Sequence, residues 1–137
     1  MGLVLDSGVL IAFERGAKPV SELLAALESD RGETEIVLSS ITVIELEHGL
    51  YRAQTPEQAR RRRDYLDTIF AAVPVEPFNR EMAQLAAKVD AEARAAGITI
   101  PFADLLIGAT ALHFGYGVAT SNLRHFQMIP GLKVISL

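Results

Sequence analysis

The chain contains no cysteine. Disulfide bonds, cysteine-ligated zinc and a thiol nucleophile are therefore excluded, and we expect no redox chemistry. No apolar run approaches the roughly 18 residues that a membrane-spanning helix needs. The first five residues lack the basic start and the apolar length of a signal peptide, so we expect a cytoplasmic protein.

Basic residues are too few to dominate the charge. The sequence has 13 Lys and Arg against 17 Asp and Glu, which gives a formal net charge of −4. This balance disfavours a protein that coats or bends DNA, because such binding depends on Lys and Arg displacing counterions. It leaves open a nuclease whose basic residues cluster locally, and it favours a cationic partner or a metal ion.

Half of the 137 residues are hydrophobic and 22% are charged. This composition excludes a disordered chain and suits a sheet that is covered on both faces. The length is typical of one domain, so we expect residues 1–137 to form a single domain.

Short β-prone segments alternate with segments of helical periodicity. Such an order predicts βαβ crossovers and an α/β fold with a parallel sheet of four to five strands. Pro74 would remove one hydrogen-bond donor from its strand, which places that strand at the sheet edge. We expect strands at residues 3–5, 35–39, 73–75, 118–120 and 133–136, and helices at 7–16, 20–29, 41–54, 56–72, 79–96 and 102–114.

Three local features guide the details of these helices. Ser7 is a cap-type residue and predicts the start of the first helix. Ile41 and Ile44 are expected to carry the core contacts of the third helix. Gly97 is expected just past the end of the helix over 79–96.

Four oxygen-bearing side chains are candidates for a divalent-metal site: Asp6, Glu45, Asp104 and Asn122. Asp6 and Asn122 follow predicted strands, and ligands of open α/β sheets bind at the carboxyl ends of strands. Glu45 and Asp104 lie in otherwise apolar helices, where an ionised carboxylate is costly unless a cation or hydrogen-bond donors offset it.

Each candidate also has an ordinary structural explanation. Asp6 suits a helix N-cap, and Glu45 suits a solvated helix position. Asp104 lies in the first turn after Pro101, where the helix dipole favours negative charge. Their convergence is what favours a site, because three carboxylates repel one another unless Mg²⁺ or Mn²⁺ neutralises them. A bound ion can also lower the pKa of a water and so generate hydroxide, and Mg²⁺ commonly binds substrate phosphates. The reaction that these residues favour is therefore hydrolysis of phosphodiester bonds.

The sequence resembles the PIN-domain ribonucleases, in particular the VapC toxins of bacterial type II toxin–antitoxin pairs. The resemblance covers essentially the whole chain and rests on motifs whose order and spacing are specific together. These are LVLDSGVLI at 3–11, SSITVIEL at 39–46, IPFADLLIGA at 100–109, and ATSN at 119–122 followed by His125 and Phe126.

The resemblance implies a three-layer α/β/α sandwich and a Mg²⁺-dependent endoribonuclease, with Mn²⁺ as a substitute, that hydrolyses RNA through metal-activated water. It implies that Asp6, Glu45 and Asp104 are metal ligands and that the partners are a VapB-like antitoxin and a second copy of the chain. The fourth family position is often aspartate, whereas this chain has Asn122. We therefore expect one well-occupied ion, with Asn122 as a catalytic residue that orients a water or ligand and Thr120 supporting its loop.

Basic residues near the predicted crevice are candidates for RNA binding: Arg15, Arg124 and His125. The run Arg60–Arg63 is more basic, but successive helical residues point about 100° apart, so a solvated face is the simpler interpretation. Ser7 is expected either to cap its helix or to hydrogen-bond the site.

Two other functions remain open from the residues. Asp6 ends a first strand and could be phosphorylated, as in haloacid-dehalogenase-like phosphatases, but Gly8 stands where those enzymes have a second aspartate. The chain could also be a non-catalytic interaction module with a degenerate site, which Asn122 and the negative net charge favour.

Overall fold

Strands and helices alternate along the chain as the sequence predicts. The computed structural model describes residues 2–32 and 34–137. The strands in these residues are β1 (Gly2–Leu5), β2 (Glu35–Ser39), β3 (Val75–Glu76), β4 (Gly117–Thr120) and β5 (Val134–Ser136). The helices are α1 (Ser7–Arg15), α2 (Val20–Arg31), α3 (Ser40–Tyr51), α4 (Pro56–Ala72), α5 (Arg80–Ala95), α6 (Phe102–Phe114) and α7 (Leu123–Phe126).

The five strands form one parallel sheet in the order β3-β2-β1-β4-β5. β1 lies at the centre, and all four of its residues are buried, as expected for a strand covered on both faces. β3 lies at the edge, where Pro74 contributes only its carbonyl oxygen, which accepts a hydrogen bond from the Leu38 N–H at 2.9 Å. The prediction of an edge strand from Pro74 is confirmed.

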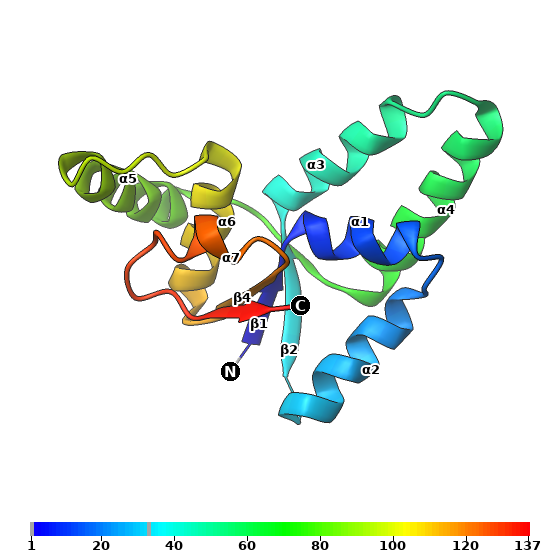
Figure 1. Cartoon of the computed structure of the whole chain (residues 1–137), viewed down its shortest axis with the longest axis horizontal. Coiled ribbons are helices and arrows are strands. Elements are labelled where there is room, and N and C mark those ends of the chain that lie inside the picture. The colour runs from blue at the N-terminus through cyan, green and yellow to red at the C-terminus, as the bar shows by residue number, and fades with distance from the viewer. Residues whose placement is uncertain (1, 33) are drawn as a thin grey trace.

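The sheet separates two hydrophobic cores because side chains alternate along each strand. Leu3 and Leu5 of β1 pack into one core with α1, α2, α3 and α4, whereas Val4 packs into the other with α5, α6 and α7. Figure 1 shows α5, α6 and α7 on one side of the strands and α1, α2 and α4 on the other. The predicted three-layer α/β/α sandwich is therefore confirmed.

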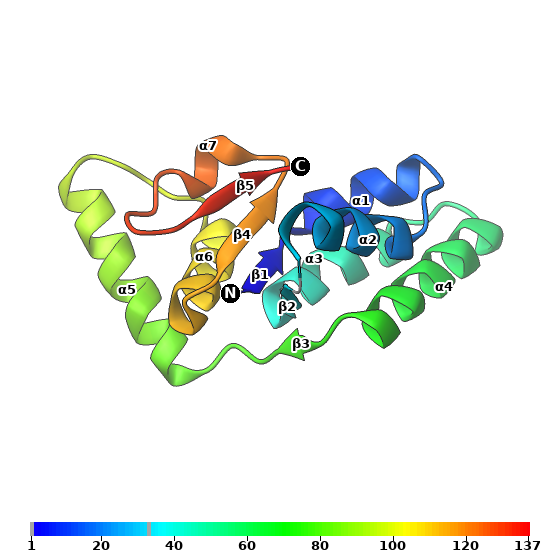
Figure 2. The same cartoon turned by 90° about the horizontal axis from the view of Figure 1, so that it is seen from below.

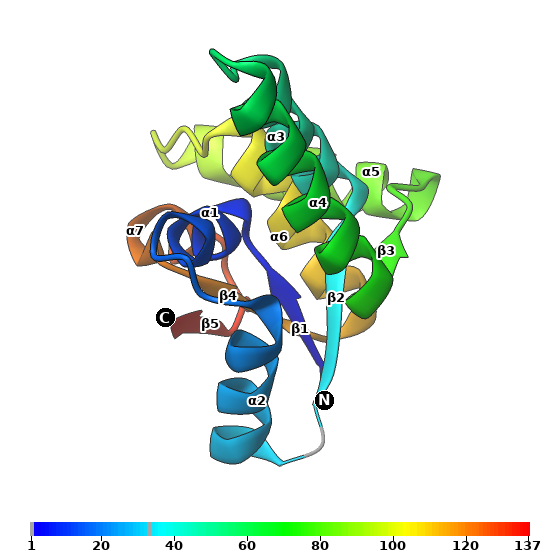
Figure 3. The same cartoon turned by 90° about the vertical axis from the view of Figure 1, so that its right-hand side faces the viewer.

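The helical pair α3 and α4 extends beyond the carboxyl end of β2, as Figures 1 and 3 show, and Figure 2 shows this pair on the opposite side of the strands from α5. One residue of α3 differs from the prediction: Ile44, expected to contact the core, is 54% exposed. The core position of α3 is instead Leu46, two residues further along, and Thr42 is also fully buried. The prediction for Ile41 is confirmed, because this side chain packs against the core that contains Val4. The prediction for Ile44 is wrong, because spacing alone does not fix which side of a helix meets the sheet.

Helix ends follow local chemistry. α5 ends at Ala95 and is followed by Gly97 with φ 77°, a left-handed conformation that glycine adopts without strain. α3 ends at Tyr51, three residues before the predicted end at Gln54.

No helix within residues 2–32 and 34–137 is both long and apolar enough to cross a membrane.

Candidate active site

The parallel topology brings the carboxyl ends of β1 and β4 together. Asp6 directly follows β1, and its backbone N–H donates to the carbonyl oxygen of Ala119 in β4 at 3.0 Å. Asn122 follows β4 by two residues. The chain direction of these neighbouring strands therefore places Asp6 beside the loop that carries Asn122, as expected for an open α/β sheet.

Asp6 is the most buried of the predicted site residues, with 6% of its surface exposed. Its Oδ1 accepts from the Ser7 N–H at 2.8 Å, and its Oδ2 accepts from the Thr120 hydroxyl at 2.8 Å. Burial raises the pKa of Asp6 above its ordinary value of 3.8 although both hydrogen bonds lower it. Asp6 is the N-cap of α1, which confirms its structural interpretation from the sequence, whereas Ser7, expected to begin the helix as a cap, is its first helical residue.

Glu45 points back toward α1. Its Oε1 accepts a hydrogen bond from the Ser7 hydroxyl at 3.0 Å. Of the two interpretations of Ser7 from the sequence, the structure therefore agrees with a hydrogen bond to the site. Partial burial raises the pKa of Glu45, and the carboxylates of Asp6 and Asp104 raise it further. Glu45 is therefore not simply a solvated helix residue, because it is partly buried and its carboxylate accepts a hydrogen bond from Ser7.

Asp104 lies in the first turn of α6 and contacts α7. Its Oδ2 is 2.7 Å from Nδ1 of His125, which donates to the carboxylate when that nitrogen carries the proton. The same Nδ1 lies 2.8 Å from Nδ2 of Asn122. The contact between His125 and Asp104 was not predicted, because a sequence separation of 21 residues gives no signal of such a pair.

One chain of polar contacts links β1, β4, α6 and α7. Asn122 donates its backbone N–H to the Thr120 hydroxyl at 2.8 Å, and that hydroxyl donates to Asp6. Thr120 therefore supports the loop as expected, and it also orients the Asp6 carboxylate. Asn122 Nδ2 and Asp104 Oδ2 both lie within hydrogen-bond distance of His125 Nδ1. This nitrogen donates to Asp104 when it carries a proton and accepts from Asn122 when it does not, so it serves one of the two at a time.

The donor set suits a hard divalent cation, since carboxylate and amide oxygens are the ligands that Mg²⁺ and Mn²⁺ prefer. Within residues 2–32 and 34–137, no three Asp, Glu or His side chains are gathered closely enough to hold one ion as they stand. Glu45 is instead directed to Ser7 and Asp104 to His125. The assignment of Asp6, Glu45 and Asp104 as metal ligands stays a prediction.

The basic candidates have different surroundings. Arg15 lines a cavity beside the site, Arg124 is exposed on α7, and His125 contacts Asp104. In the basic run, Arg63 forms a bidentate pair with Glu47 of α3, and Arg62 donates to the carbonyl oxygen of Gly49. The run is therefore only partly a solvated face, because two of its guanidinium groups attach α4 to α3.

Comparisons with known proteins agree over nearly the full length. A family model described as "PIN domain" matches residues 3–131. A ribonuclease VapC of Rickettsia bellii is 28% identical over 137 residues, which cover 100% of this chain and 97% of that protein. The VapC ribonuclease Y4jK of Sinorhizobium fredii is 33% identical over 139 residues, which cover 98% of this chain and 96% of that protein.

Solved structures share the fold. The crystal structure of VapBC2 from Rickettsia felis, bound to a DNA fragment from its promoter, matches with a TM-score of 0.86 and 20% identity over 100% of this chain and 99% of that one. The crystal structure of FitAcB from Neisseria gonorrhoeae matches with a TM-score of 0.80 and 25% identity over 97% and 96% of the two chains. The arrangement of layers and strands is therefore one that other proteins adopt over the same length.

Proposed function

The chain belongs to the PIN-domain family, and on this premise we propose that it is a Mg²⁺- or Mn²⁺-dependent endoribonuclease that acts as the toxin of a type II toxin–antitoxin pair. Relatives at 28% and 33% identity, aligned over nearly the whole chain, carry the name ribonuclease VapC. A relative from Salmonella typhimurium, 28% identical over 74% of this chain, is named a tRNA(fMet)-specific endonuclease. These names support RNA as the substrate class.

The observation that carries the proposal is the electrostatic coupling among three carboxylates from different elements. The Asp104 carboxylate raises the pKa of both Asp6 and Glu45, and Asp6 raises that of Glu45. Burial, and then neighbouring negative charge, disfavour the ionised forms of Asp6 and Glu45 in the folded protein, and a cation between the carboxylates would offset this cost. Such a cluster suits a site that binds a cation.

We assign Asp6, Glu45 and Asp104 as the residues that would hold the ion. Mg²⁺ or Mn²⁺ would there supply positive charge against the phosphodiester and lower the pKa of a water. The chain's own groups orient these ligands: the Thr120 hydroxyl fixes Asp6, the Ser7 hydroxyl fixes Glu45, and the His125 ring fixes Asp104. Asn122 is neutral and is assigned to orient a water or the substrate, since its amide offers one oxygen at most.

The proposed partners are a VapB-like antitoxin and a second copy of the chain. The structural neighbours include VapBC complexes from Rickettsia felis, Salmonella typhimurium and Haemophilus influenzae, with TM-scores of 0.86, 0.84 and 0.83. Size-exclusion chromatography with light scattering tests the dimer. A monomer at micromolar concentration would contradict that part of the proposal.

The activity is tested by incubating the purified chain with total bacterial RNA, with Mg²⁺ or with EDTA. Cleavage is expected with Mg²⁺ alone, and Asp6→Asn is expected to reduce it to the EDTA level. Asp90→Asn is the matched control, because Asp90 lies on α5 and pairs with Arg94 at 2.9 Å, outside the site. Equal cleavage by wild type and Asp6→Asn would show that the activity does not reside in this site.

A further inference from the structure

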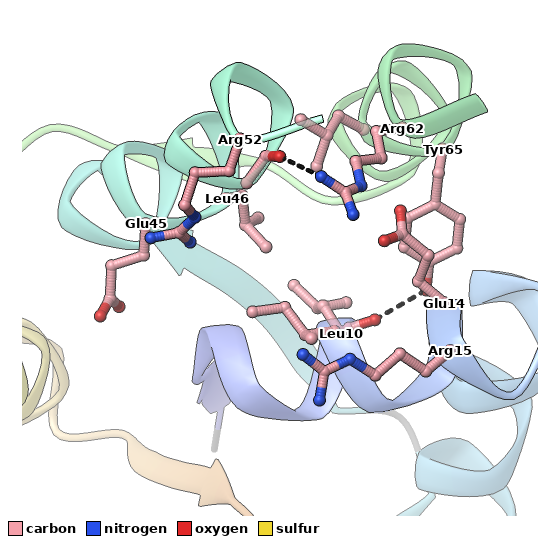
Figure 4. Close-up of a pocket in the computed structure, with 11 residues that line it drawn as sticks. Leu10, Glu14, Arg15, Glu45, Leu46, Arg52, Arg62 and Tyr65 are labelled. Carbon is pink, nitrogen blue, oxygen red and sulfur yellow. Dashed lines mark hydrogen bonds between the residues drawn. The ribbon is translucent and has the colours of Figure 1, made fainter. Parts of the chain in front are cut away.

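A second concave feature lies next to the carboxylates, between α1 and the pair α3 and α4. It is a cavity of about 210 Å³, and Glu45 lines it as well as the candidate active site. Three arginines also line it: Arg15 at the end of α1, Arg52 just past α3, and Arg62 on α4. Figure 4 shows Arg15 and Arg52 projecting from opposite walls of the cavity.

Within residues 2–32 and 34–137, the guanidinium groups of these three arginines form no ion pair within 4.0 Å. Among the residues that the structure describes, every Arg–carboxylate pair within 4.0 Å involves Arg60, Arg63 or Arg94. Arg62 donates to the carbonyl oxygen of Gly49, which is a neutral acceptor. Three unpaired cations lining one cavity are unexpected in a chain whose net charge is −4, and they indicate an anionic ligand.

The two carboxylates that line the cavity, Glu14 and Glu45, lie at its two ends. At one end, Glu14 lies near Tyr65. Burial raises the pKa of Tyr65 most, and the negative charge of Glu14 adds to this, which brings that pKa to about 12. Glu45 is held by Ser7 at the other end. In Figure 4 these two carboxylates lie on opposite sides of the cavity, with the guanidinium groups of Arg15 and Arg62 between them.

We propose that this cavity is a phosphate-binding subsite for single-stranded RNA, in which Arg15, Arg52 and Arg62 hold the backbone next to the cleaved bond. The inference rests on the proposed function for its choice of ligand. An RNA strand that approaches the three carboxylates meets negative charge there, and the cationic groups beside Glu45 would attract its phosphates. A guanidinium group can also donate two parallel hydrogen bonds to one phosphate, which would fix the position of the strand.

The expected effect follows from counterion release. Each phosphate contact on a single strand contributes about 0.7 to the slope of log affinity against log salt. Loss of two contacts, in the double variant Arg15→Gln and Arg52→Gln, should reduce the slope by about 1.4. At about 0.1 M salt this corresponds to an affinity about 25-fold lower.

The test measures fluorescence anisotropy of a labelled oligouridylate of about 12 nucleotides, a length within the usual range of single-strand sites. All titrations contain EDTA, so that binding is measured without cleavage. The matched control is Arg31→Gln with Arg80→Gln, which makes the same change in net charge at two exposed arginines outside the cavity. The variant Arg15→Lys with Arg52→Lys keeps the charge and should recover the slope but only part of the affinity.

The inference is supported if the cavity double variant loses affinity and slope as calculated while the control double variant keeps both. It is overturned if the two double variants lose the same affinity, which indicates net charge alone, or if neither does, which would leave the cavity to a protein partner. Failure of the proposed function is a separate result, seen as absence of Mg²⁺-dependent cleavage by the wild type whatever the binding data show.

Discussion

Replacement of Thr120 by valine tests the polar network around Asp6. The Thr120 side chain is fully buried, and its hydroxyl donates to Oδ2 of Asp6 at 2.8 Å and accepts from the Asn122 N–H at 2.8 Å. Valine has nearly the same shape but no hydroxyl. The main loss is a hydrogen bond to a charged acceptor, worth about 1.5–3 kcal/mol, so we expect the free energy of unfolding to fall by about 2 kcal/mol at pH 7.

The loss should depend on pH, because the bond is stronger to an ionised carboxylate than to a protonated one. The pKa of Asp6 in the folded protein is already raised above 3.8, so the stability that this group contributes declines as the pH rises through that pKa. Without the Thr120 hydroxyl the folded pKa rises further. The difference between variant and wild type should therefore be about 1 kcal/mol when Asp6 is protonated and about 2 kcal/mol when it is ionised.

Urea unfolding followed by circular dichroism between about pH 4 and pH 8 measures this difference. Thr110→Val is the control, because Thr110 is also fully buried but its hydroxyl donates to the neutral carbonyl oxygen of Leu106 at 2.9 Å. The loss in free energy of unfolding caused by Thr110→Val should not change with pH. If the Thr120→Val difference is equally independent of pH, Thr120 does not stabilise the ionised form of Asp6, and the account of the network is refuted.

Three further predictions concern the carboxylates and the contacts of α3. Glu45→Gln should stabilise the metal-free protein at pH 7 but not near pH 4, because the raised pKa of Glu45 means that folding disfavours its charged form; a loss of stability at pH 7 in urea unfolding would oppose this. Mg²⁺ at about 100 times its Kd should raise the free energy of unfolding by about 2.7 kcal/mol in the wild type, and much less in Asp104→Asn. Arg63→Gln should cost about 0.5–1 kcal/mol in thermal unfolding, since its pair with Glu47 at 2.9 Å is partly exposed; no change would show that this pair does not hold α4 to α3.

Much of the fold could be predicted because local patterns and topology agree. Pro74 predicted β3 at the edge, the alternation of apolar strands with helical segments predicted a parallel sheet, and Gly97 marked the end of α5. The exposed face of α3 could not be predicted. Ile44 has the spacing of a core residue, but the path of α3 away from the sheet turns it toward solvent.

The candidate site was predicted as a set of residues and not as a set of contacts. The position of Asp6 after β1 follows from the general geometry of parallel sheets, so sequence sufficed. The contact between His125 and Asp104 depends on how α7 returns across the end of α6, which no spacing encodes. Arg52 and Arg62 gave no signal either, because one follows a helix end and the other lies within a longer basic run.

The central claim is that the three carboxylates form a binding site for a divalent cation. A titration of metal-stripped protein with Mn²⁺, followed by electron paramagnetic resonance, tests it without any knowledge of the RNA. The account predicts a saturable site in the wild type and in Asp90→Ala, and loss of that site in Asp104→Ala. Absence of Mn²⁺ binding by the wild type at millimolar concentration, or equal binding by Asp104→Ala, would contradict it.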